Sequence, residues 1–285
     1  MQLIDGQKLA KSIILSIADR AKDFSPKPCL AVIMVGNNSA SKIYVKNKEK
    51  ACRECGFESV KYELSGSVEE REVINLIEQL NQDRGIDGIL IQLPLPDNME
   101  MKKIISTISP DKDVDCFHPL NVGKLFGSQK NSEVDILPCT ASGCLKLIKS
   151  VWPNLAGKNA VIVGRSNIVG RPTAQLLLNE DCSVTITHSK SKNLEEITKN
   201  ADILVVAVGI AKFIGRTSIK NGAVVIDVGI NRLENGNICG DVDFEDTRHL
   251  EGFLSPVPGG AGPMTVACLM YNTYQLFLRN KRIPG

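Results

Sequence analysis

The sequence lacks several features that mark common classes of protein. Its 285 residues include three histidines, and neither an H-E-x-x-H nor a G-x-S-x-G motif occurs. The zinc-protease and α/β-hydrolase classes are therefore poorly supported. The longest apolar runs, such as residues 203–208, are far shorter than the ~20 residues of a membrane-spanning helix. We therefore expect no membrane partner.

Neither sign of charge is in excess. Lys and Arg number 34 against 32 Asp and Glu, which gives a formal net charge of +2. Nucleic-acid-binding proteins normally carry a basic excess or stripe, so we expect no nucleic-acid partner. Hydrophobic residues make up 43% and charged residues 23%, the balance of a globular chain rather than a disordered one.

The nine cysteines form no recognisable framework. Their odd number and scattered positions favour reduced thiols over disulfides. Cys52 and Cys55 form the only C-x-x-C pair, and no second pair follows at zinc-site spacing, so we expect no metal site. The first residues lack the charged and apolar segments of an export signal, which favours a cytoplasmic location.

Apolar periodicity alternates between helical and strand-like segments. It predicts helices at residues 7–22, 39–55, 68–82, 98–107, 140–152, 170–179, 193–199 and 264–280. It predicts strands at residues 29–35, 58–63, 87–92, 159–163, 183–187, 202–208 and 223–228, with loops at 109–123 and 255–263. This order predicts an α/β fold with parallel sheets, covered on both faces. We expect two domains, one of residues 1–139 plus 264–285 and one of residues 140–263.

A nucleotide site is indicated after the predicted strand at 159–163. Gly164 ends this strand, Gly170 lets the next helix approach the sheet, and Pro172 suits a first helical turn. The N–H groups at the start of that helix could bind a pyrophosphate. An ordinary strand-to-helix turn is the alternative.

The residues after the next strand favour one of the two nicotinamide cofactors. An NAD site usually has an acid here that binds the ribose 2′-hydroxyl, and residues 188–192 contain none. Arg165 and Ser166 offer a cation and a hydroxyl that suit a 2′-phosphate. The sequence therefore predicts NADP rather than NAD.

Lys48 departs from the pattern of its predicted helix. The other basic residues of residues 39–55 share one outer arc, whereas Lys48 lies on the inner face with Tyr44 one turn before it. Burial favours a neutral amine, which is one way to make a base. A lysine that extends out of the edge of the core is the alternative.

Polar residues also follow the predicted strand at 87–92. Gln92 ends the strand, and Asp113 and Asp115 lie in the loop at 109–123. The carboxyl ends of parallel strands line the ligand crevice of α/β proteins. The alternatives are a glutamine that hydrogen-bonds the strand end and aspartates that form turns.

Several motifs occur in the order found in one enzyme family. They are Tyr44-x-x-x-Lys48, Gln92-Leu-Pro-Leu, Lys112-Asp-Val-Asp115, Pro138-Cys-Thr140, Gly164-Arg-Ser-x-x-Val-Gly170 and Pro258-Gly-Gly-Ala-Gly-Pro-Met-Thr265. Over nearly its whole length the chain resembles the bifunctional methylenetetrahydrofolate dehydrogenase/methenyltetrahydrofolate cyclohydrolase family of the bacterial folate pathway. The resemblance implies two α/β domains with folate in a cleft between them, NADP on a Rossmann-type second domain, and a homodimer formed through that domain.

The resemblance also implies an activity. The family oxidises 5,10-methylenetetrahydrofolate with NADP⁺ and hydrolyses the methenyl product to 10-formyltetrahydrofolate, in the one-carbon metabolism that supplies purine biosynthesis. Tyr-x-x-x-Lys also occurs in short-chain dehydrogenases, where it follows the nucleotide motif; here it precedes that motif by about 120 residues. A non-catalytic NADP sensor would have no use for an inward lysine beside Gln92.

The motifs assign roles residue by residue. Lys48 resembles the family's catalytic lysine, Gln92 the glutamine that hydrogen-bonds it, and Asp115 the acid that binds the pterin. Tyr44 resembles the tyrosine that stacks on the folate ring. The loop that closes over the substrate is matched by Pro258, Gly259 and Gly260. The cofactor contacts are matched by Gly164, Arg165, Ser166, Ser189 and Ile230.

Two positions depart from the family's pattern. Cys116 stands where glycine is usual, and a requirement for positive φ there would strain the loop and shift Asp115. Ala261 stands where valine is commoner, which leaves more room near the loop that starts at Pro258.

Overall fold

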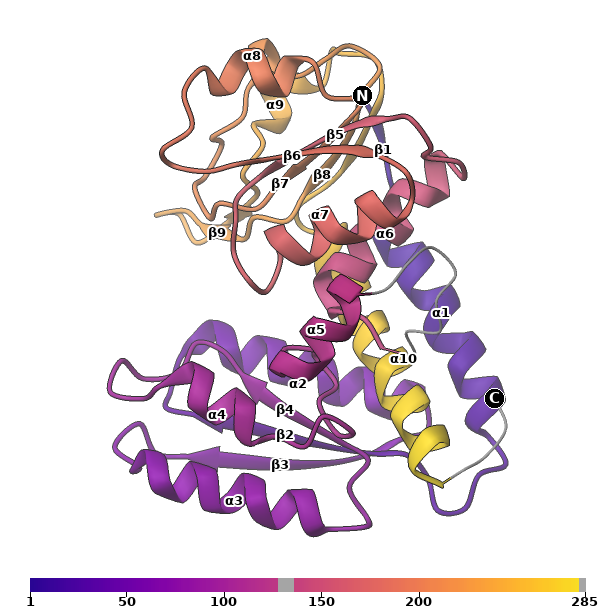
Figure 1. Ribbon diagram of the computed structural model, residues 1–285, viewed down its shortest axis with the longest axis vertical. Helices are drawn as coiled ribbons and strands as arrows, with labels where there is room; N and C mark the ends of the chain where they lie inside the picture. The colour runs from indigo at the N-terminus through magenta and orange to yellow at the C-terminus, as the bar shows by residue number, and fades with distance from the viewer. Residues whose placement is uncertain (128–135, 282–285) are drawn as a thin grey trace. The chain divides into compact units, whose positions relative to one another are not determined.

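The computed structural model describes residues 1–127 and 136–281, and its contacts divide the chain into two compact units (Figure 1). The three-stranded unit is formed mainly by Lys11–Leu125 together with the chain from Leu269 onward. The six-stranded unit is formed mainly by Met1–Ala10 and Thr140–Cys268. The division falls inside helix α1 (Gly6–Ala21) and helix α10 (Ala261–Lys281), so each of these helices contributes to both units.

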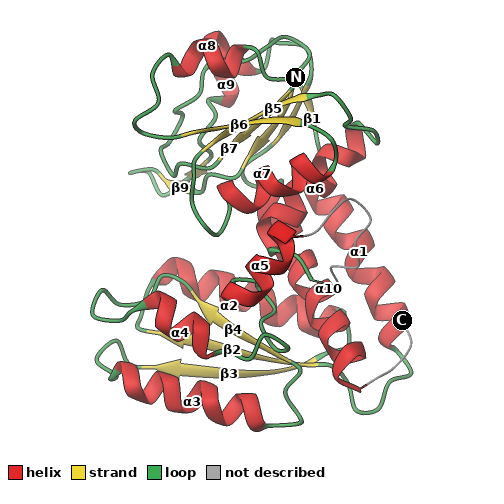
Figure 2. Ribbon diagram, viewed as in Figure 1, coloured by secondary structure: helices red, strands yellow, loops and turns green. Residues whose placement is uncertain are grey.

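The three-stranded unit contains a parallel sheet in the order β3-β2-β4 (Figure 2). Its strands are β2 (Cys29–Val35), β3 (Glu58–Leu64) and β4 (Gly88–Gln92). Its helices are α2 (Ser39–Glu54), α3 (Glu70–Gln82), α4 (Met101–Thr107) and α5 (Pro119–Gly127). Every residue of β2 and β4 is buried, because both faces of this sheet are covered, as is usual for a parallel sheet.

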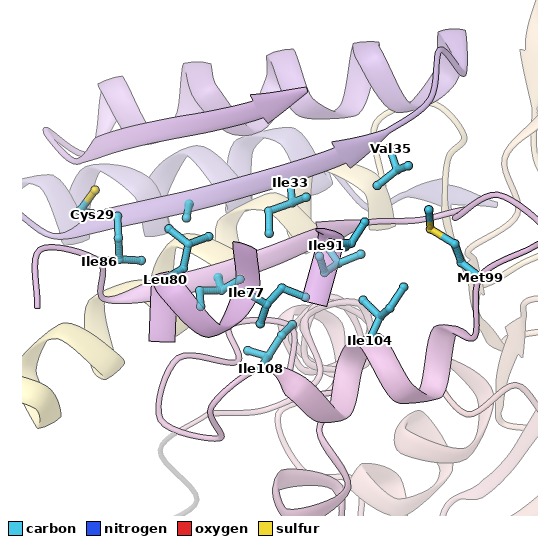
Figure 3. Close-up of a cluster of buried hydrophobic side chains, with 13 residues drawn as sticks. Cys29, Ile33, Val35, Ile77, Leu80, Ile86, Ile91, Met99, Ile104 and Ile108 are labelled. Atoms are coloured by element: carbon cyan, nitrogen blue, oxygen red, sulfur yellow. The ribbon is translucent and has the colours of Figure 1, made fainter. Parts of the chain in front are cut away.

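One face of this sheet carries a cluster of buried aliphatic side chains (Figure 3). Alternate residues of β2, such as Ile33, meet Ile77 of α3 and Ile104 of α4. Burying one such side chain contributes about 1.5–3 kcal/mol, so the cluster holds the two helices on the sheet. This packing fixes the position of β4 and of the polar residues that follow it.

The six-stranded unit contains a second parallel sheet, in the order β1-β11-β8-β7-β5-β6. Its strands are β1 (Gln2–Leu3), β5 (Asn159–Val163), β6 (Ser183–Thr187), β7 (Ile203–Val206), β8 (Val224–Asp227) and β11 (Phe253–Ser255). From β5 the chain runs out to β6 and then returns to β7 on the other side of β5. The strand order therefore reverses between β5 and β7, the position at which doubly wound sheets bind ligands.

The remaining elements of this unit are short or lie beside the sheet. They are α6 (Cys139–Val151), α7 (Gly170–Asn179), α8 (Leu194–Lys199), a 3₁₀ turn (Arg216–Ser218), the antiparallel pair β9 (Asn231–Arg232) and β10 (Ile238–Cys239), and α9 (Phe244–Thr247). No helix among residues 1–127 and 136–281 is long and apolar enough to cross a membrane.

The α/β class and the parallel sheets confirm the prediction from periodicity, and two local predictions were wrong. The expected loop at 109–123 contains the start of α5, and α10 begins at Ala261, inside the expected loop at 255–263. The expected domain boundaries stay a prediction. Met1–Ala10 falls in the six-stranded unit, because β1 pairs with β11.

Candidate active site

Lys48 and Gln92 form a hydrogen-bonded pair in the three-stranded unit. The Lys48 amine donates to Oε1 of Gln92 at 2.9 Å, and Nε2 of Gln92 donates to the Leu93 carbonyl at 2.7 Å. The second bond fixes the amide so that its oxygen faces the lysine. Gln92 is 8% exposed and Lys48 is partly buried, so the lysine does lie on the inner face of α2.

The pair is held by the start of α2 and the end of β4. The Asn38 side chain accepts a hydrogen bond from the Ser41 N–H at 3.0 Å and caps α2. Tyr44 lies one turn before Lys48 and is partly buried, and burial raises the pKa of its phenol. A ring and an amine are thereby presented on the same side of one helix.

Burial lowers the pKa of Lys48, against the opposing charges of Asp115 and Cys139. Burial likewise raises the pKa of Asp115, and the nearby Asp113 adds to the rise, whereas Lys48 and a hydrogen bond from the Cys139 thiol oppose it. The lysine and the aspartate therefore lie close enough to interact, and burial shifts both toward the neutral form.

Asp115 is brought to this place by a segment that runs beside β4. Ile89 of β4 donates its N–H to the Lys112 carbonyl at 2.7 Å and bridges to Asp113. The Asp113 carboxylate is 2% exposed and accepts the N–H groups of Phe117 at 3.2 Å and His118 at 2.8 Å. Asp113 therefore organises the turn, as one sequence alternative proposed.

Cys116 adopts the left-handed conformation, with φ of 59°. This position therefore requires positive φ, the condition under which cysteine in place of glycine strains the loop. The side chain is fully buried, and its thiol is 3.7 Å from the Ile136 carbonyl. The expected effect of this strain on the position of Asp115 stays a prediction.

Asn272 is a site neighbour that sequence reasoning missed. It lies on α10, is 2% exposed, and donates to the carbonyls of Val114 and Leu137, each at 2.8 Å. The Cys139 thiol also donates to the Val114 carbonyl at 3.3 Å. Asn272 thereby links the backbone at Val114 to the backbone at Leu137 by hydrogen bonds. No sequence signal marks it, because its partners are more than a hundred residues away in the chain.

The two glycines of the nucleotide motif are required by close backbone contacts in the six-stranded unit. Gly164 has φ of +124°, and a Cβ there would overlap the carbonyl of Ala207, which follows β7. A Cβ on Gly170 would overlap the Gly164 carbonyl. The loop after β5 is thus packed against the start of α7 and the end of β7, with no room for a side chain. A backbone this close to the strand ends can approach a bound phosphate.

The Ser166 hydroxyl is hydrogen-bonded to backbone N–H groups at the start of α7. It accepts the N–H groups of Val169 at 3.1 Å and Gly170 at 3.2 Å, so two of the N–H groups expected to bind a pyrophosphate are paired. The hydroxyl can still donate its own hydrogen to an anion. Ser166 and Arg165 are both exposed.

Arg165 and Ser189 follow neighbouring strands. Val163 of β5 is paired with Thr187 of β6, and Gly164 donates to the Thr187 carbonyl at 3.0 Å. Both side chains are exposed at this carboxyl edge, and residues 188–192 place no acid beside them. A cation and a hydroxyl therefore lie just beyond the ends of two neighbouring strands.

The remaining predicted residues lie elsewhere in the six-stranded unit. Ile230 follows β8 and is 46% exposed. In the loop at 258–260, Pro258 is exposed, Gly259 has φ of +111° and Gly260 is buried. A Cβ on Gly6 would lie 2.7 Å from the Gly259 oxygen, so the start of α1 fits closely against this loop. Gly6 is a second contact that the sequence did not reveal.

Comparisons with known proteins identify the family of the chain. The family model described as "Tetrahydrofolate dehydrogenase/cyclohydrolase, catalytic domain" matches residues 4–115, and the model described as its "NAD(P)-binding domain" matches residues 138–281. The chain is 51% identical over 275 residues to the "Bifunctional protein FolD" of Listeria innocua, and the match covers 95% of each chain.

Solved structures give the same result. The bifunctional FolD dehydrogenase/cyclohydrolase of Campylobacter jejuni has a TM-score of 0.93 at 45% identity, covering 98% of this chain and 99% of that chain. The FolD of Trypanosoma brucei, complexed with NADP and an inhibitor, has a TM-score of 0.94 at 35% identity, covering 98% of each chain. These matches confirm the resemblance inferred from the motifs. The chain therefore belongs to the tetrahydrofolate dehydrogenase/cyclohydrolase family and is a bifunctional enzyme of that family.

Proposed function

We propose that Lys48, Gln92 and Asp115, together with Tyr44, form the folate site of this enzyme, and that the carboxyl edge of the six-stranded sheet forms its NADP site. The enzyme oxidises 5,10-methylenetetrahydrofolate to the 5,10-methenyl compound with NADP⁺ and hydrolyses that compound to 10-formyltetrahydrofolate. The observation that carries the site assignment is the hydrogen-bonded pair of Lys48 and Gln92 beside Asp115.

The oxidation depends mainly on how the folate is held. NADP⁺, when bound, accepts a hydride from the methylene carbon. Asp115 can accept two hydrogen bonds from the amino and ring N–H groups of the pterin, and Tyr44 can stack on its ring. No protein base is needed for this step, so the chain contributes by positioning. A neutral Lys48 avoids repelling the cationic product.

The hydrolysis requires proton transfer as well as positioning. Water attacks the methenyl carbon and must lose a proton. The ring then opens by cleavage of one bond between that carbon and a ring nitrogen, which takes up a proton. Lys48 can accept that proton because burial has lowered its pKa, and Gln92 holds the amine in one orientation. In this proposal the same lysine matters more for hydrolysis than for oxidation.

The six-stranded unit fits the phosphates of NADP. Gly164 and Gly170 let backbone approach the strand ends, and the loop at 258–260 is proposed to close over the substrate. Arg165, Ser166 and Ser189 lie at the ends of β5 and β6, where no acid would repel a 2′-phosphate. Ile230 offers an exposed apolar contact after β8.

Asp115→Ala tests the folate assignment. Loss of the Asp115 carboxylate, which is proposed to bind the pterin, should lower both activities together. The Kd of NADP measured by titration calorimetry should stay near that of the wild type. The oxidation is followed on 5,10-methylenetetrahydrofolate with NADP⁺ by the absorbance of NADPH, and the hydrolysis by the loss of absorbance of supplied methenyltetrahydrofolate. A variant that still bound folate tightly would show that Asp115 does not bind the pterin.

Arg165→Ala tests the preference for NADP. Removing a charge-assisted contact should weaken NADP binding by about 1–3 kcal/mol and leave NAD binding nearly unchanged. The measurement is the Kd of each cofactor for both proteins. Equal turnover of the wild type with NADP⁺ and NAD⁺ would contradict the assignment of Arg165, Ser166 and Ser189.

We further propose that the enzyme is a cytoplasmic homodimer formed through its six-stranded unit. None of the nine cysteines is in a disulfide and eight are buried, which suits a reducing compartment. Phe213, Ile238 and Phe244 of the six-stranded unit are each about 40% exposed. A second copy could cover such side chains. Light scattering should give twice the chain mass of 31.0 kDa, and the mass of one chain would exclude the dimer.

A further inference from the structure

Two buried carboxylates lie at the carboxyl edge of the six-stranded sheet, and neither has a role in the function proposed above. Asp227 ends β8 and is 3% exposed, and Asp241 follows β10 and is fully buried. Charged side chains are rarely buried without partners. Their hydrogen bonds therefore indicate what they hold in place.

Asp241 binds three successive backbone amides after β7. Its Oδ2 accepts the N–H groups of Val208 at 2.7 Å and Gly209 at 2.9 Å, and its Oδ1 accepts the N–H of Ile210 at 3.0 Å. Oδ1 also accepts Nδ2 of Asn231 at 2.8 Å. One side chain thus joins the segment after β7 to the residue that follows Ile230.

Asp227 in turn holds the backbone around Asp241. Its Oδ1 accepts the N–H groups of Asp241 at 2.9 Å and Gly229 at 3.0 Å, and its Oδ2 accepts the N–H of Val242 at 2.9 Å. A Cβ on Gly229 would overlap the Asp241 carboxylate. The segments after β7 and β8 are therefore packed around one carboxylate without spare room.

The segments that Asp241 joins lie next to the nucleotide loop at the carboxyl edge of the sheet. Gly164 of the nucleotide loop meets Ala207, the residue before the three amides that Asp241 binds. If the 2′-phosphate lies beside Arg165 and Ser189, at the ends of β5 and β6, the rest of the dinucleotide extends across the sheet order toward β7 and β8. The nicotinamide half would then lie against the segments that Asp241 joins.

We infer that Asp241 is a positioning residue for the nicotinamide half of the cofactor, because its carboxylate fixes residues 208–210 and the Ile230 loop in one arrangement. The inference rests on the NADP site proposed above. Asp241 itself is buried beneath these segments and acts through their backbone. Its removal should therefore affect one half of the cofactor and not the other.

The test compares NADP with a fragment that lacks the nicotinamide half. In Asp241→Asn, an amide N–H₂ replaces one acceptor oxygen and leaves a backbone N–H of residues 208–210 without its partner, so these residues no longer keep one arrangement and NADP binding weakens by roughly tenfold. We expect the Kd of NADP to rise by this factor and the dehydrogenase kcat to fall. The Kd of adenosine 2′,5′-bisphosphate, and hydrolysis of supplied methenyltetrahydrofolate, should stay near wild type.

Asp202→Asn is the matched control. Asp202 precedes β7, at the opposite end of the same strand, and accepts the Asn159 N–H at 2.9 Å and the Lys220 amine at 2.6 Å. The Asp202→Asn variant should be less stable than the wild type and should bind NADP with the same Kd. If Asp202→Asn and Asp241→Asn weaken NADP equally, or if Asp241→Asn weakens the fragment as much as NADP, Asp241 has only a structural role.

A second variant keeps the test decisive if Asp241→Asn does not fold. Asn231→Ala removes one donor to the same carboxylate and leaves the carboxylate in place. It should raise the Kd of NADP a few-fold and leave that of the fragment unchanged, and an unchanged Kd of NADP would overturn the inference. A wild type that binds the fragment but not NADP would contradict the proposed function instead.

Discussion

At the scale of single residues, the candidate site depends on how Gln92 is oriented. Its Nε2 donates to the Leu93 carbonyl, so only its oxygen is available to Lys48. The lysine gives one N–H to that oxygen, and burial disfavours its ammonium form. An amine that is both oriented and closer to neutral can accept a proton from an attacking water.

Lys48→Met should therefore separate the two activities. Methionine has a similar length and no nitrogen, so hydrolysis of supplied methenyltetrahydrofolate should fall by at least the ~10²-fold typical of a general base. Hydride transfer should fall less, because it needs mainly positioning. Each reaction is assayed separately, with the spontaneous hydrolysis subtracted.

Lys46→Met is the matched control for this variant. Lys46 lies on the exposed outer face of the same helix, so both activities should remain at the level of the wild type. If Lys48→Met opens the ring as fast as the wild type, Lys48 has a structural role only.

The sequence predicted individual residues to different degrees. The inward position of Lys48 followed from helical periodicity, because a face of a helix is a local property. The separate roles of Asp113 and Asp115 could not be predicted, because they depend on the contacts of Asp113 with Phe117 and His118 in the folded turn. The positive φ of Cys116 was suspected only because the family usually has glycine there.

At the scale of elements, α10 completes the three-stranded unit. Its ring of Phe277 lies 5.2 Å from that of Phe24, centroid to centroid, and Asn272 binds the backbone beside Asp115. A helix placed last in the chain thereby supports a site whose other residues lie between 44 and 139. The helix contributes by positioning, because Asn272 donates to backbone carbonyls and not to the proposed catalytic groups.

Asn272→Ala should loosen the Asp115 segment. The carbonyls of Val114 and Leu137 lose their buried donor, which costs about 1–3 kcal/mol of unfolding free energy. The KM for the folate substrate should rise for both activities, because Asp115 adjoins Val114. Urea unfolding and steady-state kinetics measure the two effects.

Asn280→Ala provides the comparison on the same helix. Asn280 donates to the Asp111 carbonyl at 3.1 Å in an exposed position, so its loss should change little. If Asn272→Ala loses stability while the KM for folate stays that of the wild type, the asparagine does not position Asp115.

The elements that the sequence did not predict share a physical cause. β1, β9, β10 and β11 have two or three residues each, too few to show a period of two. Helix α5 contains Gly123 and Gly127, which disfavour a helix, and Asn121 ties it to Asp113 and Pro110. Such elements are stabilised by tertiary contacts, which periodicity cannot reveal.

At the scale of the whole molecule, the two α/β units and their order were predictable because their central strands are long buried runs. β2, β4, β7 and β8 are buried at every residue, and β5 is buried at every residue except its first. The sheet to which the first residues belong was not predictable, because two residues of β1 carry no pattern. The parallel order of the second sheet also brings a buried carboxylate, Asp227, to one edge and a partly buried carboxylate, Asp202, to the other.

Asp227 and Asp202 should make the stability of the protein depend on pH in opposite directions. Burial raises the pKa of Asp227 to about 6, with the charge of Asp241 adding to the rise, against three backbone N–H groups that lower it. Burial also acts to raise the pKa of Asp202, but hydrogen bonds from Lys220 and the Asn159 N–H outweigh it, and the pKa is lowered.

The measurement is the free energy of unfolding in urea, between about pH 3 and pH 7, of the wild type, Asp227→Asn and Asp202→Asn. From its ordinary pKa of 3.8 up to about 6, the native Asp227 holds more protons than the unfolded chain, so its contribution falls as pH rises. The stability of the wild type relative to Asp227→Asn should therefore fall by roughly 3 kcal/mol, at 1.36 kcal/mol per pKa unit. Relative to Asp202→Asn it should rise as pH increases from about 3 to about 5 and then stay level, because a native pKa below 3.8 favours the charged form only around and below that pH. Lost hydrogen bonds shift each curve by a constant, so only the slopes decide, and slopes of the same sign for both variants would contradict the opposite environments of the two carboxylates.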